Sequence, residues 1–128
     1  MSPLSVDEWM NFDNLDDTNR SWNMMMHKVA SFHSKHNFSD PVNNGHDMGY
    51  RIALTVEELG EFAAAITKGK PDAEAAEELA DLLILILGHS LALEVDLYNE
   101  FNKKIEKVMQ RPARHTKLGI RITEYRDE

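Results

Sequence analysis

The sequence predicts an all-α protein, an antiparallel helical bundle that is completed by homo-oligomerisation and carries a short extended C-terminal arm. Apolar residues recur at steps of three and four over long stretches, which places them on one face of a helix. The stretch from Leu82 to Leu93 is apolar on nearly every side, so it must also be buried on nearly every side. The chain of 128 residues suits a single domain over residues 1–128, and a second copy covers such a helix most easily.

The N-terminal part of the chain predicts a short helix followed by a long one. Ser5 and Glu8 have the spacing of a capping box for the short helix. The long helix is expected over residues 19–35. Its apolar stripe comprises Trp22, Met25, Met26, Val29, Ala30 and Phe32. Residues 37–47 are rich in asparagine and contain proline and glycine, so they predict a loop.

Two further long helices are expected over residues 48–67 and 72–93, joined by a tight turn at Gly69. The first of them has an apolar core seam at steps of four and three. This seam comprises Ile52, Val56, Leu59, Ala63 and Ile66. A fourth helix is expected over residues 96–110. Residues 118–125 alternate between apolar and polar, as in an edge strand or an extended arm.

Two acidic clusters flank the tight turn. They are Glu57-Glu58-Leu59-Gly60-Glu61 and Glu77-Glu78-Leu79-Ala80-Asp81. In an antiparallel helix pair, residues equally far from the turn lie at equal height. Glu58 and Asp81 are twelve and eleven residues from Lys70, and Glu61 and Glu78 are nine and eight residues from it. We therefore expect four carboxylates to converge. Because such a cluster repels itself, a hard divalent cation with oxygen ligands is its natural occupant.

The net charge of −8 argues against a general nucleic-acid binder and against a binder of anionic membranes. The charge is uneven, because a basic stretch follows the acidic middle of the chain. That stretch contains Lys103, Lys104, Lys107, Arg111, Arg114, Lys117 and Arg121. An acidic metal site together with a basic segment suits a phosphorylated small molecule, and a solvated helix face is the alternative for any single lysine.

The absence of cysteine excludes disulfides and thiolate metal sites and fits a cytoplasmic protein. The N-terminal residues lack the basic start and apolar stretch of a signal peptide. The apolar run that begins at Leu82 is shorter than a membrane span and is interrupted by His89 and Ser90. We therefore expect no membrane partner, and we expect His89 to be a satisfied core or interface histidine.

The two acidic clusters and their spacing resemble the paired EExxE and ExxD motifs of the MazG-like nucleoside triphosphate pyrophosphohydrolases. The resemblance extends through the apolar run after Asp81 and the lysine-rich fourth helix, and it covers roughly residues 48–111. It implies an all-α fold whose complete bundle forms in a homodimer or a dimer of dimers. It also implies Mg²⁺-dependent cleavage of a (deoxy)nucleoside triphosphate to the monophosphate and pyrophosphate, with Mn²⁺ as a substitute metal.

The resemblance also implies roles for individual acidic residues. The expected metal ligands are Glu58, Glu61, Glu78 and Asp81. Glu57 takes the position of an extra glutamate that lies close to the metal ligands or orients the attacking water. Glu57 and Glu61 are the candidates for the catalytic carboxylate, and the sequence leaves open which of them acts as the base.

The triphosphate and the nucleobase need further contacts. The candidates for phosphate binding are Lys103, Lys104, Lys107 and Arg111. The family often has a lysine, then an asparagine four residues later, then an arginine; Lys104 and Arg111 fit, but Val108 replaces the asparagine. A base needs a stacking face and hydrogen bonds. Its candidates are Trp22, Phe32, His33 and His46. His46 lies twelve residues before Glu58, where some relatives place a substrate-contacting histidine.

Three alternatives compete with this interpretation. A phosphoribosyl-ATP pyrophosphatase shares the fold and the carboxylate arrangement. A non-catalytic helical dimerisation module would use the acids only as a solvated surface, since glutamate favours helices. A di-iron carboxylate bundle requires Glu-x-x-His on two helices. No glutamate of this chain has a histidine three residues later, so the di-iron alternative is set aside.

Overall fold

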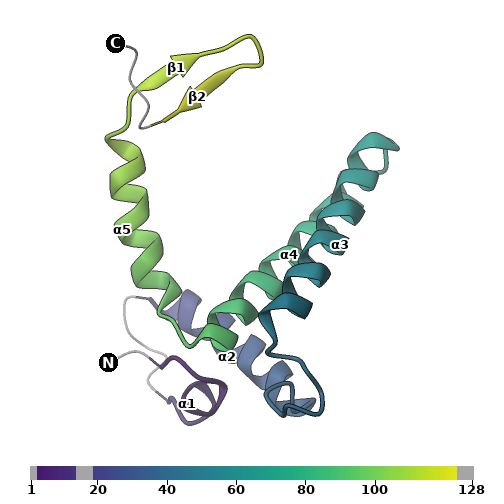
Figure 1. Cartoon of the computed structure of the whole chain (residues 1–128), viewed down its shortest axis with the longest axis vertical. Coiled ribbons are helices and arrows are strands. Elements are labelled where there is room, and N and C mark those ends of the chain that lie inside the picture. Colours follow the sequence, from purple (N-terminus) through teal and green to yellow (C-terminus); the bar gives the residue numbers. More distant parts are fainter. Residues whose placement is uncertain (1–2, 14–18, 124–128) are drawn as a thin grey trace. The chain divides into compact units, whose positions relative to one another are not determined.

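The computed structural model describes residues 3–13 and 19–123 and confirms the all-α fold, with one small two-stranded sheet (Figure 1). The elements are α1 Val6–Met10, α2 Arg20–Lys35, α3 Met48–Thr67, α4 Asp72–Leu93, α5 Leu97–Met109, β1 Ala113–His115 and β2 Ile120–Ile122. The chain divides into two compact units, Met1–Asp96 and Leu97–Glu128. In the described part of the chain, no helix combines the length and the apolarity that a membrane span requires.

Local capping chemistry sets the limits of the α3–α4 pair. Asp47 caps α3, because its carboxylate accepts a hydrogen bond of 2.8 Å from the N–H of Tyr50. The turn after α3 contains Gly69 at a φ of 64°, a left-handed conformation that glycine adopts without strain. α3 and α4 then run antiparallel and side by side (Figure 1). Both helices begin and end at the predicted residues.

The core of the first unit lies where α1, α2 and α4 pack together. Ser5 caps α1 as predicted, because its hydroxyl oxygen accepts a hydrogen bond of 3.1 Å from the N–H of Glu8. Trp9 of α1 is only 3% exposed. The other large contributors are Val6, Met26, Val29, Leu87 and Leu91. Burying an apolar side chain of this size stabilises the fold by roughly 1.5–3 kcal/mol.

The face of α3 that packs against α4 differs from the predicted core seam. The seam residues are exposed, and Val56 for example is 63% exposed. The residues of α3 that are buried or half-buried instead include Arg51, Thr55, Glu58, Phe62 and Ala65. This set has the same periodicity but is shifted by one residue, a rotation of about 100°. This set faces α4, to which Arg51 and Thr55 form hydrogen bonds, and the apolar seam remains available to another surface.

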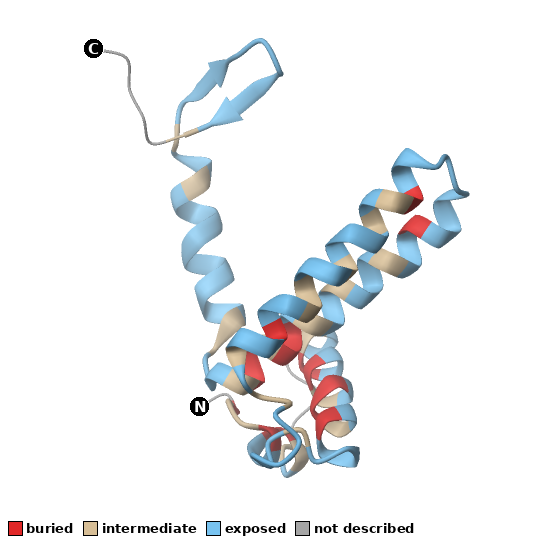
Figure 2. Cartoon of the chain, turned by 45° about the vertical axis from the view of Figure 1, so that its right-hand side comes forward, coloured by how far each residue is buried: buried red, intermediate tan, exposed pale blue. Residues whose placement is uncertain are grey.

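The buried residues of the α3–α4 pair concentrate at its two ends (Figure 2). Ala65 and Ala75 are buried near the turn, and Arg51, Leu87 and Gly88 are buried at the opposite end. All residues between these ends are half-buried or exposed. The middle of the pair is therefore accessible to solvent, and the two acidic clusters lie there.

The second unit contains α5 and the two strands. No described residue of α5 is buried, and most of its apolar residues are exposed, with Phe101 at 59%. β1 pairs antiparallel with β2, with Ala113 opposite Ile122. Within residues 118–125, which are expected to form an edge strand or an extended arm, Ile120–Ile122 form β2, whereas the partner strand β1 was not predicted. Residues 124 and 125 of the predicted arm lie outside the described residues.

Candidate metal centre

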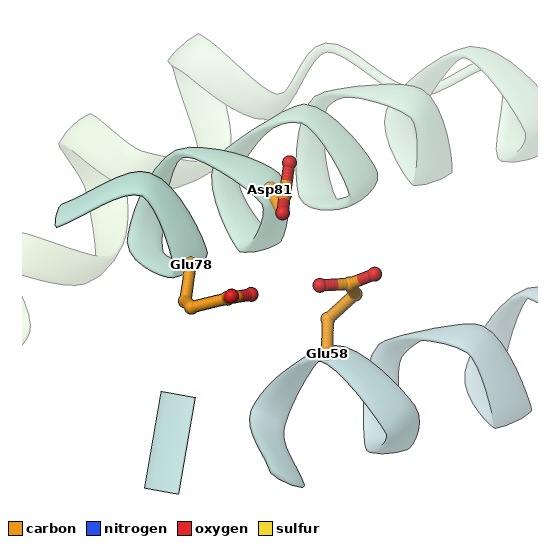
Figure 3. A group of neighbouring side chains, drawn as sticks. All are labelled: Glu58, Glu78 and Asp81. Atoms are coloured by element: carbon orange, nitrogen blue, oxygen red, sulfur yellow. The ribbon is translucent and has the colours of Figure 1, made fainter. Parts of the chain in front are cut away.

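Three carboxylates from two helices converge in the middle of the α3–α4 pair (Figure 3). Glu58 projects from α3 toward Glu78 and Asp81 of α4. Each residue offers one oxygen, and the three oxygens lie within 4.8 Å of one another. Glu58 and Glu78 are half-buried, and Asp81 is exposed. Counting residues from the turn predicted that these carboxylates converge. The structure shows this convergence for Glu58, Glu78 and Asp81.

The pKa of Glu58 reflects this crowding of negative charge. Partial burial, followed by the charges of Asp81, Glu78 and Glu61, raises the pKa of Glu58 above its ordinary value, and a hydrogen bond with Glu78 raises it further. A raised pKa means that the folded chain holds the proton more tightly than the unfolded chain does. Ionised Glu58 therefore destabilises the fold at neutral pH. A cation placed between the carboxylates would remove this repulsion.

The other predicted acidic residues of α3 lie outside this compact group. Glu57 and Glu61 are both exposed. Glu61 lies close enough to the group for its charge to raise the pKa of Glu58. The structure thus gathers three of the four expected metal ligands and leaves Glu61 at the edge of the group.

The donor set fits a hard divalent cation. All three side chains are carboxylates, and no histidine or cysteine belongs to the group. Oxygen donors suit Mg²⁺ and Mn²⁺, whereas zinc sites usually include nitrogen or sulfur ligands. Mg²⁺ usually binds a few carboxylates and completes its shell with water and substrate oxygens. The solvent-accessible middle of the helix pair offers room for such additional ligands.

A polar network that the sequence analysis did not predict lies beside the carboxylates. Arg51 is 3% exposed and donates from Nε to Nδ1 of His89 at 2.9 Å. Its Nη1 donates to the carbonyl oxygen of Gly45 at 2.9 Å, and its Nη2 donates to that of Leu85 at 3.2 Å. The expectation that His89 is a satisfied histidine is confirmed. Arg51 could have been found as well, because Arg51 and His89 each lie nineteen residues from Lys70.

Two of the predicted base contacts, His33 and His46, form a hydrogen bond with each other. Nδ1 of His33 lies 2.8 Å from Nε2 of His46. His33 is 2% exposed, and its burial, with the positive charge of Arg51, lowers its pKa to about 3. His46 is half-buried and lines a polar pocket of about 140 Å³ together with Asp7 and Glu94. Of the two histidines, His46 is therefore the one that a ligand can reach.

Phe32, another predicted base contact, lines an apolar groove between α2 and α4. Its side chain is 44% exposed, and its ring packs against the ring of Phe38 in a T-shaped arrangement at a centroid distance of 5.1 Å. The groove has a volume of about 360 Å³, and Leu83 and Leu87 form its opposite wall. Trp22 is half-buried on α2 and does not line this groove. The groove therefore offers Phe32, rather than Trp22, as an aromatic surface.

The predicted phosphate contacts belong to the second unit. Lys103, Lys104 and Lys107 are exposed on α5, and Arg111 is half-buried just after it. Lys103 forms an exposed ion pair of 2.9 Å with Glu100, a type of pair that contributes little to stability. Lys104 and Lys107 are three residues apart, so they share one face of α5. Their approach to the carboxylates of the first unit stays a prediction.

Comparison with known proteins identifies the same segment of the chain. A family model described as the MazG nucleotide pyrophosphohydrolase domain matches residues 50–116, which is more than half of the chain. This segment includes α4 and α5, the converging carboxylates and the buried Arg51. No curated protein and no solved structure matches the chain.

Proposed function

The chain belongs to the MazG nucleotide pyrophosphohydrolase family, and from this premise we propose that it hydrolyses (deoxy)nucleoside triphosphates to the monophosphate and pyrophosphate with Mg²⁺. The observation that carries the proposal is the group formed by Glu58, Glu78 and Asp81. Mn²⁺ also suits carboxylate ligands and is the expected substitute.

The acidic residues take distinct roles in this proposal. Glu58, Glu78 and Asp81 hold the cation, and Glu61 joins them when the site is loaded. A bound divalent cation would neutralise the phosphate oxygens and lower the pKa of water. The attacking water oxygen forms a bond to phosphorus, and the bridging oxygen leaves with pyrophosphate. Glu57 or Glu61 accepts the proton of that water, since both are exposed carboxylates of α3 within three residues of Glu58.

The substrate contacts are proposed from side-chain chemistry and accessibility. The basic side chains of α5 and the residue after it, which are Lys103, Lys104, Lys107 and Arg111, bind the triphosphate. Phe32, which lines the apolar groove, supplies a surface for the base, and His46, which lines a separate polar pocket, supplies a hydrogen bond to the substrate. His33 acts indirectly, by holding the ring of His46. Trp22 is retained as a weaker candidate, because it does not line the groove of Phe32.

A second copy of the chain is the proposed cover for the exposed apolar surface. The seam of α3 is exposed, and Ile66 at 58% and Leu59 at 55% are typical of it. Ile52, which is 57% exposed, belongs to the same seam. Apolar patches of this kind mark interaction sites. We therefore expect a homodimer or a dimer of dimers, in which this surface is buried.

The test of the activity is a panel of ribonucleoside and deoxyribonucleoside triphosphates, with phosphoribosyl-ATP, incubated with the protein and Mg²⁺. Release of pyrophosphate from the triphosphates is the expected result. We expect Asp81→Asn and Glu61→Gln to abolish it without loss of helicity. Glu74→Gln is the matched control, because it removes the same charge from an exposed position of α4 outside the group.

The other outcomes distinguish the competing functions. Turnover of phosphoribosyl-ATP alone would replace the proposed substrate by that compound. Full activity in both Asp81→Asn and Glu61→Gln would mean that the site lies elsewhere. If the wild type releases no pyrophosphate and Mg²⁺ does not change its thermal unfolding, the chain is a non-catalytic helical module.

A further inference from the structure

Arg51 is a buried cation whose guanidinium connects three segments of the first unit. It donates to the side chain of His89 and the carbonyl oxygen of Leu85, both on α4, and to the carbonyl oxygen of Gly45 in the loop before α3. In the described part of the chain, no carboxylate forms an ion pair with Arg51. Burying an arginine without an acidic partner costs desolvation free energy. An ion pair with a carboxylate therefore does not explain why Arg51 is buried.

The hydrogen bonds around His89 form a closed ring between α3 and α4. Because Nε of Arg51 can only donate, Nδ1 of His89 accepts, and the proton of the neutral imidazole is on Nε2. Nε2 then donates to Oγ1 of Thr55 at 2.8 Å. The hydroxyl of Thr55 donates in turn to the carbonyl oxygen of Arg51 at 2.8 Å. Every donor in this ring has one acceptor, so the ring defines one relative placement of the two helices.

On α3 this ring lies one helical turn from the carboxylates, because Thr55 precedes Glu58 by three residues. On α4 its member His89 follows Asp81 by eight residues, about two turns, and the carbonyl oxygen of Leu85, which also accepts from Arg51, lies one turn from Asp81. Toward the turn, buried alanines close the other end of the helix pair. The mutually repelling carboxylates thus lie between two ends that hold the helices together.

Gly88 of α4 leaves room for the side chains of Arg51 and His33 next to the helix backbone. A Cβ atom at this position would lie 2.7 Å from Nε2 of His33 and would also collide with Nη2 of Arg51. Glycine is unfavourable inside a helix. The close approach of the guanidinium and the imidazole to the backbone of α4 accounts for its presence here.

We propose that Arg51 is a positioning residue for the metal centre. Its hydrogen bonds, closed through His89 and Thr55, hold α3 and α4 at the separation and rotation that bring Glu58 to Asp81 against their repulsion. Arg51 touches neither the cation nor the substrate in this role. The inference rests on the proposed function for what the carboxylates bind. Groups bonded directly to metal ligands typically change metal affinity by about 10–100-fold, and Arg51, which acts through the placement of the helices, is expected at the lower end of this range.

The test compares Arg51→Met with the matched control Lys70→Met. Both variants remove one positive charge from the helix pair, but Lys70 lies in the exposed turn and forms an exposed ion pair of 3.8 Å with Glu74. Mn²⁺ binding is measured by calorimetry without nucleotide, and kcat and KM are measured over a range of Mn²⁺ concentrations. We expect Arg51→Met to weaken Mn²⁺ binding about 10-fold and to lower kcat at limiting Mn²⁺. Saturating Mn²⁺ restores kcat, and Lys70→Met behaves as the wild type.

Thr55→Val tests the same role if Arg51→Met does not fold. It opens the ring but keeps the three hydrogen bonds of Arg51, so we expect a smaller weakening of Mn²⁺ binding. Unchanged Mn²⁺ affinity in the folded variant overturns the inference. A loss of kcat that saturating Mn²⁺ does not restore also overturns it, since this indicates a merely structural role. Absence of Mn²⁺ binding in the wild type contradicts the proposed metal centre itself.

Discussion

At the scale of single residues, Glu58 combines partial burial with three acidic neighbours. We predict that Glu58→Gln raises the unfolding temperature of the metal-free protein, because it removes a carboxylate from this repelling group. The same variant loses most of its stabilisation by Mg²⁺. At a Mg²⁺ concentration 100 times its Kd, the wild type gains about 2.7 kcal/mol. Thermal unfolding with Mg²⁺ and with a chelator measures both effects.

The matched control for this prediction is Glu77→Gln. Glu77 is an exposed neighbour of Glu78 on α4 but does not belong to the converging group. We expect its substitution to leave both the metal-free unfolding temperature and the effect of Mg²⁺ close to those of the wild type. A Glu58→Gln protein that Mg²⁺ stabilises as strongly as the wild type would exclude Glu58 as a ligand.

Three buried or half-buried histidines predict a loss of stability in acid. Burial, with the charge of Arg51, lowers the pKa of His33 to about 3 and also lowers the pKa values of His46 and His89. The unfolded chain therefore binds protons first as the pH falls below about 6.5. The stability is complete above that pH and decreases below it, by at most about 1.4 kcal/mol per pH unit for each histidine.

Urea unfolding between pH 7.5 and pH 4.5, in steps, measures this decrease. Glu58 acts in the opposite sense, since its raised pKa makes protonation favour the folded state. The informative quantity is therefore the difference between the wild type and His33→Asn, which removes one titrating ring. We expect a shallower decrease for His33→Asn. Parallel curves would show that His33 does not stay neutral in the folded protein.

At the scale of secondary-structure elements, helix boundaries were predictable and the orientation of α3 was not. Caps, the glycine turn and the apolar periodicity are local signals, and they predict α3 and α4 to the residue. The rotation of α3 about its axis depends on which face finds partners on α4. Arg51, Thr55 and Glu58 have the composition of a solvated surface, so only their pairing with His89 and Asp81 across the turn indicates a buried face. The apolar seam of α3 has the stronger periodicity, and for this reason it was wrongly predicted to be the face that packs against α4.

A pair of glycines in α3 and α4 tests this packing. We predict that Gly88→Ala destabilises the protein by about 1–3 kcal/mol, because the added Cβ displaces Arg51 and His33. Gly60→Ala is the matched substitution on α3, where nothing lies within 4 Å of the added atom, and it is expected to stabilise by roughly 0.5–1 kcal/mol. Urea unfolding measures both values. Equal effects at the two positions would mean that Gly88 is not packed against this network.

At the scale of the whole molecule, the exposed apolar surface predicts self-association. Ile66 lies in the exposed apolar seam of α3, and we predict that Ile66→Glu shifts the protein toward the monomer because it places a charge in the proposed interface. Light scattering coupled to size exclusion measures the mass over a range of concentrations. Val42→Glu is the control, since Val42 is 89% exposed in the loop before α3. A wild type that is monomeric at every concentration contradicts the oligomer.

The sequence predicts the first unit better than the second. The carboxylate group depends on two helices joined by one short turn, so counting residues from Lys70 is enough to bring Glu58 and Asp81 together. The pairing of β1 with β2 depends on a partner strand of three residues, Ala113–His115, which has too little periodicity to be recognised. The accessibility of His46 and Phe32 depends on packing between segments distant in sequence, which residue types alone do not indicate.

The even spacing around Lys70 restricts where the length of this chain can change during evolution. One inserted residue rotates the rest of a helix by about 100° and shifts it by about 1.5 Å. An insertion or deletion between Arg51 and Glu58, or between Asp81 and His89, would therefore separate the ring of hydrogen bonds from the carboxylates. Added residues in the turn around Gly69 would leave both faces aligned. Related chains are thus expected to differ in length at this turn, while the seven-residue and eight-residue intervals stay constant.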